Sequence, residues 1–121
     1  MTKRAVFNTA AKHLLTQNCR SVDDFGRCLY RGNNGTKCAV GVFIPNELYH
    51  RDLEGNILMI PATLEREFPG NSKAIALAKL THKYEVILTE LQLIHDKLLP
   101  EEWRTALDKL AKEEKIIRPE Y

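Results

Sequence analysis

The segment from Cys28 to Tyr49, which reads CLYRGNNGTKCAVGVFIPNELY, constrains the fold more than any other part of the chain. Its first residues, 28–31, are short, aromatic and apolar, as in a strand. The Gly-Asn run at 32–35 accepts positive φ and predicts a tight reversal. The apolar run from Cys38 to Ile44 then has two interpretations: a strand that completes a hairpin, or a short buried helix that stops at the following proline. Because the run is apolar on every face, periodicity does not decide between them, and its small residues favour the helix.

Composition describes an ordinary soluble globular chain. The 121 residues are 44% hydrophobic and 28% charged, which predicts a single domain over 1–121. The 18 basic and 16 acidic residues leave a net charge of +2, too balanced to indicate a nucleic-acid or membrane partner. With no apparent secretory signal, the three cysteines are expected as reduced thiols, which predicts a cytoplasmic protein.

Local signals predict a mainly helical chain. Helices are expected over four segments: one capped by Thr2 or Asn8 and ending at Gln17, a short one from Pro61 to Phe68, a long one from Ser72 to Leu98, and one starting at Pro100. The long segment carries an apolar stripe that is expected to face its own core: Leu77, Leu80, Tyr84, Ile87, Leu91, Ile94 and Leu98. The predicted class is α+β, mainly α-helical, with a small β-hairpin or strand pair packed against several helices and two long C-terminal helices.

The motif LYRG, a Gly/Asn turn, KCAVG, and IP with a tyrosine four residues after the proline resembles a family of small uncharacterised proteins of tailed bacteriophages. More distantly it resembles bacterial domains of unknown function built around a Cys-Ala-Leu-Gly motif. The resemblance covers most of the chain. The more distant bacterial relatives are expected to have Asn-Asp where this chain has His95-Asp96, which weighs against a shared catalytic histidine. The resemblance implies a small accessory protein of the bacterial cytoplasm that binds a host or viral protein and can modulate a host factor.

Cys38 is the main candidate for covalent chemistry. At the first turn of a helix its thiolate is favoured by unpaired N–H groups, and His95 or His82 can serve as the base. Asp96 is expected to hold a backbone N–H of the Cys38 turn, because neighbouring helical residues point about 100° apart and it cannot easily orient His95. The alternative function is therefore a cysteine-dependent hydrolase or transferase, and the other interpretation is a buried, inert cysteine. Gly41 is expected to touch the C-terminal helix near His95 and Asp96, with no room for a side chain.

A binding set is predicted around the turn: Tyr30, Arg31, Gly32, Asn33, Asn34 and Tyr49. The Arg31–Gly35 segment can cradle an anion through N–H groups and the guanidinium, or can be a turn that needs Gly and Asn for its dihedral angles. No metal and no cofactor is predicted, because the cysteines lack the short spacing of a zinc knuckle. The expected partner is a protein, without nucleic acid or membrane, and the sequence leaves monomer and homodimer open.

Overall fold

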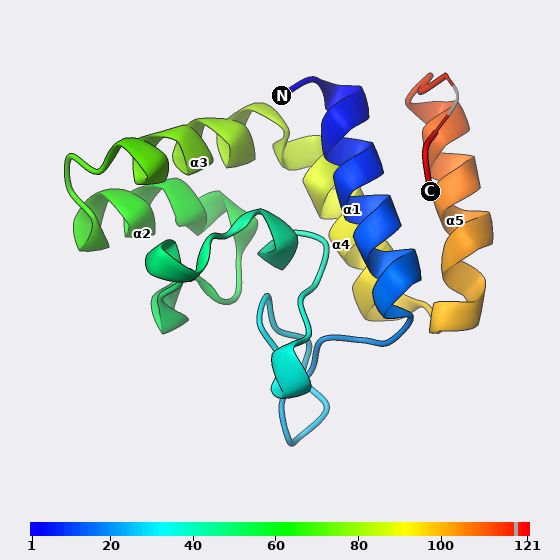
Figure 1. The fold of residues 1–121 in the computed structure, drawn as a ribbon, viewed down its shortest axis with the longest axis horizontal. Helices are drawn as coiled ribbons and strands as arrows, with labels where there is room; N and C mark the ends of the chain where they lie inside the picture. The colour runs from blue at the N-terminus through cyan, green and yellow to red at the C-terminus, as the bar shows by residue number, and fades with distance from the viewer. Residues whose placement is uncertain (118) are drawn as a thin grey trace.

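The computed structural model describes residues 1–117 and 119–121, and α-helices dominate these residues. In chain order the helices are α1 (Lys3–Gln17), α2 (Ile60–Glu67), α3 (Ser72–Lys83), α4 (Glu85–Lys97) and α5 (Pro100–Glu113). The connection between α1 and α2 contains 3₁₀ turns: η1 (Asn33–Gly35), η2 (Gly41–Phe43), η3 (Asn46–Leu48), η4 (Arg51–Leu53) and η5 (Ile57–Met59). Helices α1, α4 and α5 pack together at one end of the molecule, and α2 and α3 form a hairpin at the other (Figure 1).

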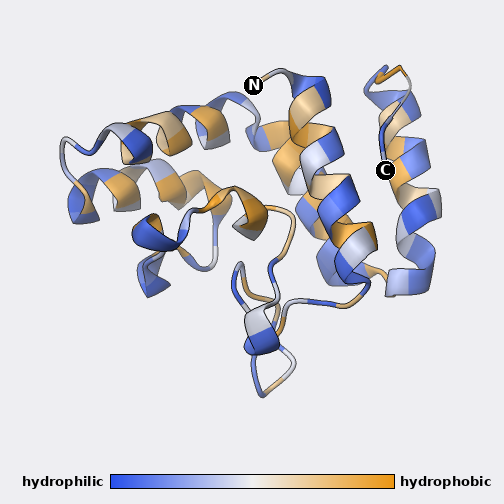
Figure 2. Ribbon diagram, viewed as in Figure 1, coloured by the Kyte–Doolittle hydropathy of each residue, from blue (hydrophilic) through white to orange (hydrophobic). Residues whose placement is uncertain are grey.

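The core lies mainly where α1, α4 and α5 face one another. Orange and blue alternate along these helices in Figure 2, as expected for amphipathic helices that each bury one face. The completely enclosed side chains here include Phe7, Leu14, Leu88, Leu91, Trp103 and Leu107. Burying a side chain of this size contributes roughly 1.5–3 kcal/mol before the entropy cost is counted. These three helices therefore form the platform against which the connection is held.

The predicted α+β class, with its β-hairpin or strand pair, is wrong. The described residues form no sheet, and their β-type pairing is limited to two isolated bridges, Val22–Cys28 and Arg31–Lys37. Cys38 to Ile44 is not a strand, and its only regular structure is the single 3₁₀ turn η2. Of the two interpretations of this run, the helical one is the nearer, although the helix is reduced to one turn.

The pairing at Arg31–Lys37 stops because the next pair of backbone groups is diverted to other partners. A further rung would need the Tyr30 N–H to donate to the Cys38 carbonyl. Instead the Tyr30 N–H donates to Glu54 Oε1 at 2.7 Å, and the Cys38 carbonyl accepts the N–H of Val42 at 3.2 Å. A carboxylate from a distant loop thus replaces the second strand.

The single helix predicted from Ser72 to Leu98 is also wrong, because the chain breaks at Tyr84, where φ is −110° and ψ is 23°. The apolar stripe is nevertheless packed as predicted: Leu77, Ile87 and Leu91 are buried, and Leu80, Tyr84, Ile94 and Leu98 lie against the core. Helix α3 packs on α2, whereas α4 packs on α1 and α5, and these neighbours lie in different directions (Figure 1). Tertiary packing therefore sets the break, which no glycine or proline marks.

The starts of three helices were predicted correctly from local signals in the sequence. Thr2 Oγ1 accepts the N–H of Ala5 at 3.1 Å and begins α1, as predicted. Pro61 lies in the first turn of α2, and Pro100 begins α5. Among the described residues, none of the helices is long and apolar enough to cross a membrane.

Candidate functional site

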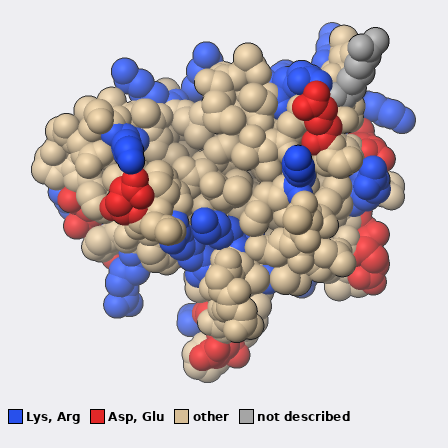
Figure 3. Space-filling model, in the orientation of Figure 1, with Lys and Arg blue, Asp and Glu red and all other residues tan. Residues whose placement is uncertain are grey.

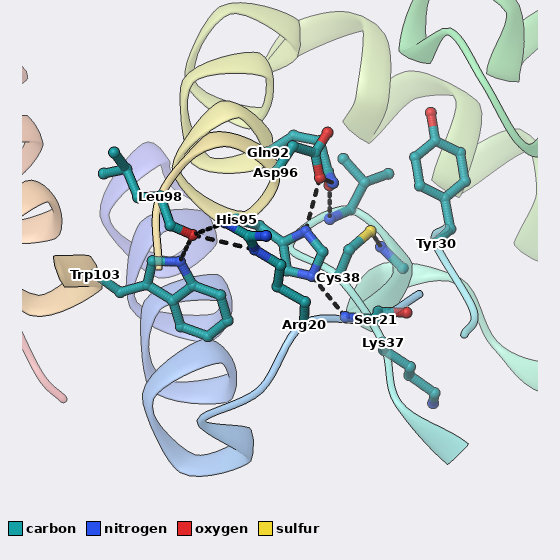
Figure 4. A network of polar contacts seen from close by, with 12 residues as sticks. Arg20, Ser21, Tyr30, Lys37, Cys38, Gln92, His95, Asp96, Leu98 and Trp103 are labelled. Atoms are coloured by element: carbon teal, nitrogen blue, oxygen red, sulfur yellow. Dashed lines mark hydrogen bonds and ion pairs between the residues drawn. The ribbon is translucent and has the colours of Figure 1, made fainter. Parts of the chain in front are cut away.

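The three predicted catalytic residues lie in one region, where the connection crosses the C-terminal half of α4. Figure 4 shows Cys38 next to the His95 ring but with its sulfur turned away from that ring, and it shows Asp96 and Gln92 together on the same helix as His95. His95 and Asp96 are on the last turn of α4, and Cys38 directly precedes the turn that leads into η2. His82, the other base considered, is exposed on α3.

His95 is completely buried, and both nitrogens of its ring have a hydrogen-bond partner. The backbone N–H of Ser21 donates to Nε2 at 2.9 Å. Because a backbone N–H can only donate, Nε2 must be unprotonated, and the ring proton sits on Nδ1, which lies 2.7 Å from Asp96 Oδ1. Trp103 stacks on the ring with centroids 5.6 Å apart. The imidazole has no free lone pair for a substrate, and it bridges α4 to the segment that follows α1.

Asp96 binds its neighbour His95 directly, so the expectation that it cannot orient this ring is wrong. The same oxygen accepts Gln92 Nε2 at 2.8 Å, and Gln92 Oε1 accepts the backbone N–H of Val40 at 3.2 Å. Burial alone would raise the pKa of the Asp96 carboxyl, but the hydrogen bonds from His95 and Gln92 outweigh it and hold that pKa below its ordinary value. The expectation that Asp96 itself holds a backbone N–H of this turn is also wrong, because Gln92 takes the N–H of Val40 and Asp96 supports the turn through Gln92.

Cys38 is completely enclosed. Its sulfur accepts the N–H of Gly41 at 3.3 Å, and no hydrogen bond joins it to His95, although both residues lie in the described part of the chain. Burial raises the pKa of the thiol to about 12, against the lowering effect of the N–H groups of Gly41 and Val40. The thiolate is the nucleophilic form, so this geometry favours an unreactive thiol at neutral pH.

Cys28 is the thiol that lies directly beside His95 and Asp96, and the sequence did not single it out. Its sulfur, a ring nitrogen of His95 and a carboxylate oxygen of Asp96 all lie within 4.8 Å of one another. Burial, followed by the charge of Asp96 and a hydrogen bond to it, raises the pKa of this thiol. All three groups are metal ligands in other proteins, but here the Ser21 N–H occupies Nε2 and keeps the ring proton on the nitrogen that faces Asp96. The trio is therefore better suited to a buried hydrogen-bond network than to a metal.

A second group of metal-ligating side chains joins His50, Asp52 and Glu67. The guanidinium of Arg66 already forms ion pairs with both carboxylates of this group. Its Nη2 lies 3.2 Å from Asp52 Oδ2, and its Nε lies 3.0 Å from Glu67 Oε1. His50 Nδ1 accepts the backbone N–H of Asp52 at 3.0 Å. The guanidinium satisfies both carboxylates, and the group ties η4 to α2.

Arg31, the charged member of the predicted binding set, is used inside the protein. Its Nη1 donates to Asn46 Oδ1 at 2.7 Å, and its Nη2 donates to the carbonyl of Ile44 at 2.6 Å. The guanidinium lies 4.9 Å from the ring centroid of Tyr49, whose hydroxyl donates to Glu54 Oε2 at 2.8 Å. The guanidinium Nε is buried and has no hydrogen-bond partner among the described residues. The fork of the guanidinium thus braces η3, which leaves little of it for an anion.

The other members of the predicted binding set do not share one surface. Tyr30 is buried, and its hydroxyl reaches the carbonyl of Gly55 at 3.5 Å. Asn33 and Asn34 are exposed at the tip of the turn. Gly32 has φ −98°, so it does not supply the positive φ expected of it, and an added Cβ would lie 2.4 Å from the backbone nitrogen of Val22. Close packing therefore explains this glycine.

Gly41 has the predicted close contact, but with a different partner. A Cβ at this position would lie 1.9 Å from the carbonyl oxygen of Tyr30, rather than against the C-terminal helix near His95 and Asp96. The glycine allows the start of η2 to rest on the backbone of the preceding turn. This contact holds Cys38 and its neighbours beneath the surface.

A pocket of about 360 Å³ opens beside the network, and sequence reasoning did not find it. Its lining carries no formal charge and comprises Tyr30, Gly55, Asn56, Ile57, Thr89, Gln92 and Leu93. Leu93 is 43% exposed, and Leu58 and Met59, which follow Ile57, are 58% and 57% exposed. The pocket therefore presents a neutral, partly apolar surface.

The face of the molecule seen in Figure 3 carries basic and acidic side chains intermingled, rather than one field of a single sign.

Comparison with known proteins adds no relative. No protein-family model matches the chain, and neither the curated proteins nor the solved structures contain a match. The resemblance to tailed-phage proteins consequently stays a prediction from the motif.

Proposed function

We propose that the chain is a small accessory protein of bacteriophage type that acts in the bacterial cytoplasm by binding another protein, with a host factor as the favoured partner. The phage assignment is supported by the LYRG…KCAVG…IP motif. Binding rather than catalysis is supported by one contrast: the Cys38 thiol and the His95 ring are sealed and satisfied, whereas the pocket beside them is open and apolar at its rim.

The chemistry of the pocket indicates the kind of partner. With no charged side chain in its lining, the pocket favours an uncharged segment that places an apolar side chain against Leu93 and Ile57. Asn56 and Thr89 provide polar groups near a partner backbone. Such a surface suits a protein better than a nucleic acid, whose phosphates require clustered basic residues.

Site-specific crosslinking tests the proposal. A photo-crosslinking amino acid at Leu93 should capture one protein in infected bacteria, and the same group at Leu99, a similarly exposed leucine at the start of α5, should not. The captured protein is then purified and its affinity measured by calorimetry. Leu93→Asp should weaken binding strongly, and Leu99→Asp should leave it unchanged. Equal capture at both positions, or no affinity between the purified proteins, would refute the proposal.

The cysteine-enzyme alternative is separated by a different readout. A hydrolase or transferase that uses Cys38 requires an activity that Cys38→Ser abolishes in a variant that still folds. Binding through the pocket instead survives Cys38→Ser. Both measurements use the same purified proteins.

A further inference from the structure

A groove of about 450 Å³ runs between α2 and α3, on the hairpin that lies at the opposite end of the fold from α5 (Figure 1). Small side chains keep it open: Ala62 comes from α2, and Ala74 and Ala78 come from α3. Ile75 stands at its edge and is 48% exposed. A hole and a protruding apolar side chain are therefore neighbours on the same surface.

Two opposite charges accompany the groove. Glu65 of α2 and Lys79 of α3 both line it, both are exposed, and neither forms an ion pair with any other described residue. The helices are antiparallel about the connection at 68–71, so Lys79 lies opposite the first residue of α2. Glu65 lies about five residues further along, roughly 7.5 Å nearer the connection. The base thus lies toward the end of the groove far from the connection, and the acid lies nearer the connection.

We propose that this groove is a self-association surface, occupied by the same groove of a second copy of the chain. A two-fold axis that passes midway between Glu65 and Lys79 brings each of these residues against the other in the second copy, because in such an interface residue i contacts j and j contacts i. Glu65 of each copy then meets Lys79 of the other, which gives two ion pairs from one pair of residues. Ile75 of each copy enters the hole left by the alanines, as a knob enters a hole between packed helices.

Charge complementarity is the reason for choosing a second copy over an unrelated helix. An occupant that pairs with both Lys79 and Glu65 must carry an acid and a base at the same separation and in the reverse order. A second copy related by a two-fold axis carries such a pair, namely its own Glu65 and Lys79. The helices are already packed within each copy, so association joins folded monomers. This surface is separate from the pocket at Leu93, and the two proposals stand or fall independently.

Charge exchange tests the pairing. Sedimentation equilibrium of the purified protein from micromolar to millimolar concentration should show a reversible dimer. Glu65→Lys alone and Lys79→Glu alone each place like charges together twice, and each should weaken the dimer by roughly tenfold or more. A mixture of the two single variants should form a mixed dimer of restored affinity, because all four facing charges are then opposite. The double variant should also recover.

Controls separate the groove from general effects of charge and stability. Glu90→Lys and Lys112→Glu make the same changes of net charge at exposed positions outside the groove and should leave the dimer unchanged. Ile75→Asp should abolish the dimer with helicity intact, whereas Val86→Asp, at a more exposed aliphatic residue on α4, should not. A wild type that stays monomeric throughout, or a dimer indifferent to the charge exchange, would overturn the proposal. Leu93→Asp should not alter the dimer.

Discussion

Replacing Gly41 by alanine is the sharpest test of the packing around Cys38. The added Cβ would lie 1.9 Å from the Tyr30 carbonyl oxygen, whereas carbon and oxygen approach to about 3.3 Å even in close contacts, so that carbonyl must move by roughly 1.4 Å. It accepts the N–H of Cys38 at 3.2 Å, and the N–H of the same Tyr30 donates to Glu54 at 2.7 Å. Overpacking costs about 1–3 kcal/mol, and weakening these hydrogen bonds adds a further 1–3 kcal/mol. We therefore expect Gly41→Ala to lose about 2–6 kcal/mol of unfolding free energy.

Urea denaturation followed by circular dichroism measures this loss. With a slope of about 1.5 kcal/mol per molar urea, a loss of about 2–6 kcal/mol lowers the midpoint by roughly 1–4 M. The loss is a large part of the roughly 5–15 kcal/mol that stabilises a typical domain. Gly35→Ala is the matched control: Gly35 has φ 71° and open space around it, so only the strained backbone conformation costs free energy, about 1–2 kcal/mol. If Gly41→Ala is no less stable than Gly35→Ala, the contact with Tyr30 does not exist.

Three further predictions concern reactivity, pH and association. Cys38, enclosed and with its thiol pKa raised to about 12, should react with a thiol reagent far more slowly than exposed Cys19; fast labelling of Cys38 would revive the nucleophile hypothesis. The pKa of Asp96 is lower in the folded chain than its ordinary value near 4, so its ionised form stabilises the fold above that value and the benefit disappears as pH falls through the lowered one. Asp96→Asn should therefore cost about 1–3 kcal/mol at neutral pH, with a gap from wild type that closes in acid, and a gap independent of pH in urea melts would contradict this. Dilution through the micromolar range should leave helicity unchanged, because the stripe from Leu77 to Leu98 is packed within the chain; loss of helix on dilution would show that it needs a partner.

The helix ends were predictable because their causes are local. Thr2 offers an oxygen to free N–H groups one turn later, and Pro61 and Pro100 carry the backbone angle of a first helical turn. The burial of Cys38 was one of two interpretations, and the small residues around it already pointed that way. In each case the residue and its immediate neighbours hold the necessary information.

The failures share a different cause, which is a partner far away in the chain. The hairpin was lost because Glu54, a residue in an unremarkable polar loop, takes the N–H of Tyr30. His95 and Asp96 were recognised, but the Ser21 N–H that determines the ring's tautomer carries no signal in its side chain. Cys28 was set aside on spacing, although the fold brings it to Asp96. No periodicity or motif reports such long-range pairs.

By itself the sequence determined the amphipathic helices, most of their ends, and the need for glycine at 41, because propensity, capping and side-chain volume act within a turn or two. Only the tertiary structure decided that the chain breaks at Tyr84, that Gly41 rests on Tyr30, and that the polar residues of α4 are used to hold the connection. A buried polar group must find a partner wherever the fold provides one, and which partner is near depends on how all the helices pack together.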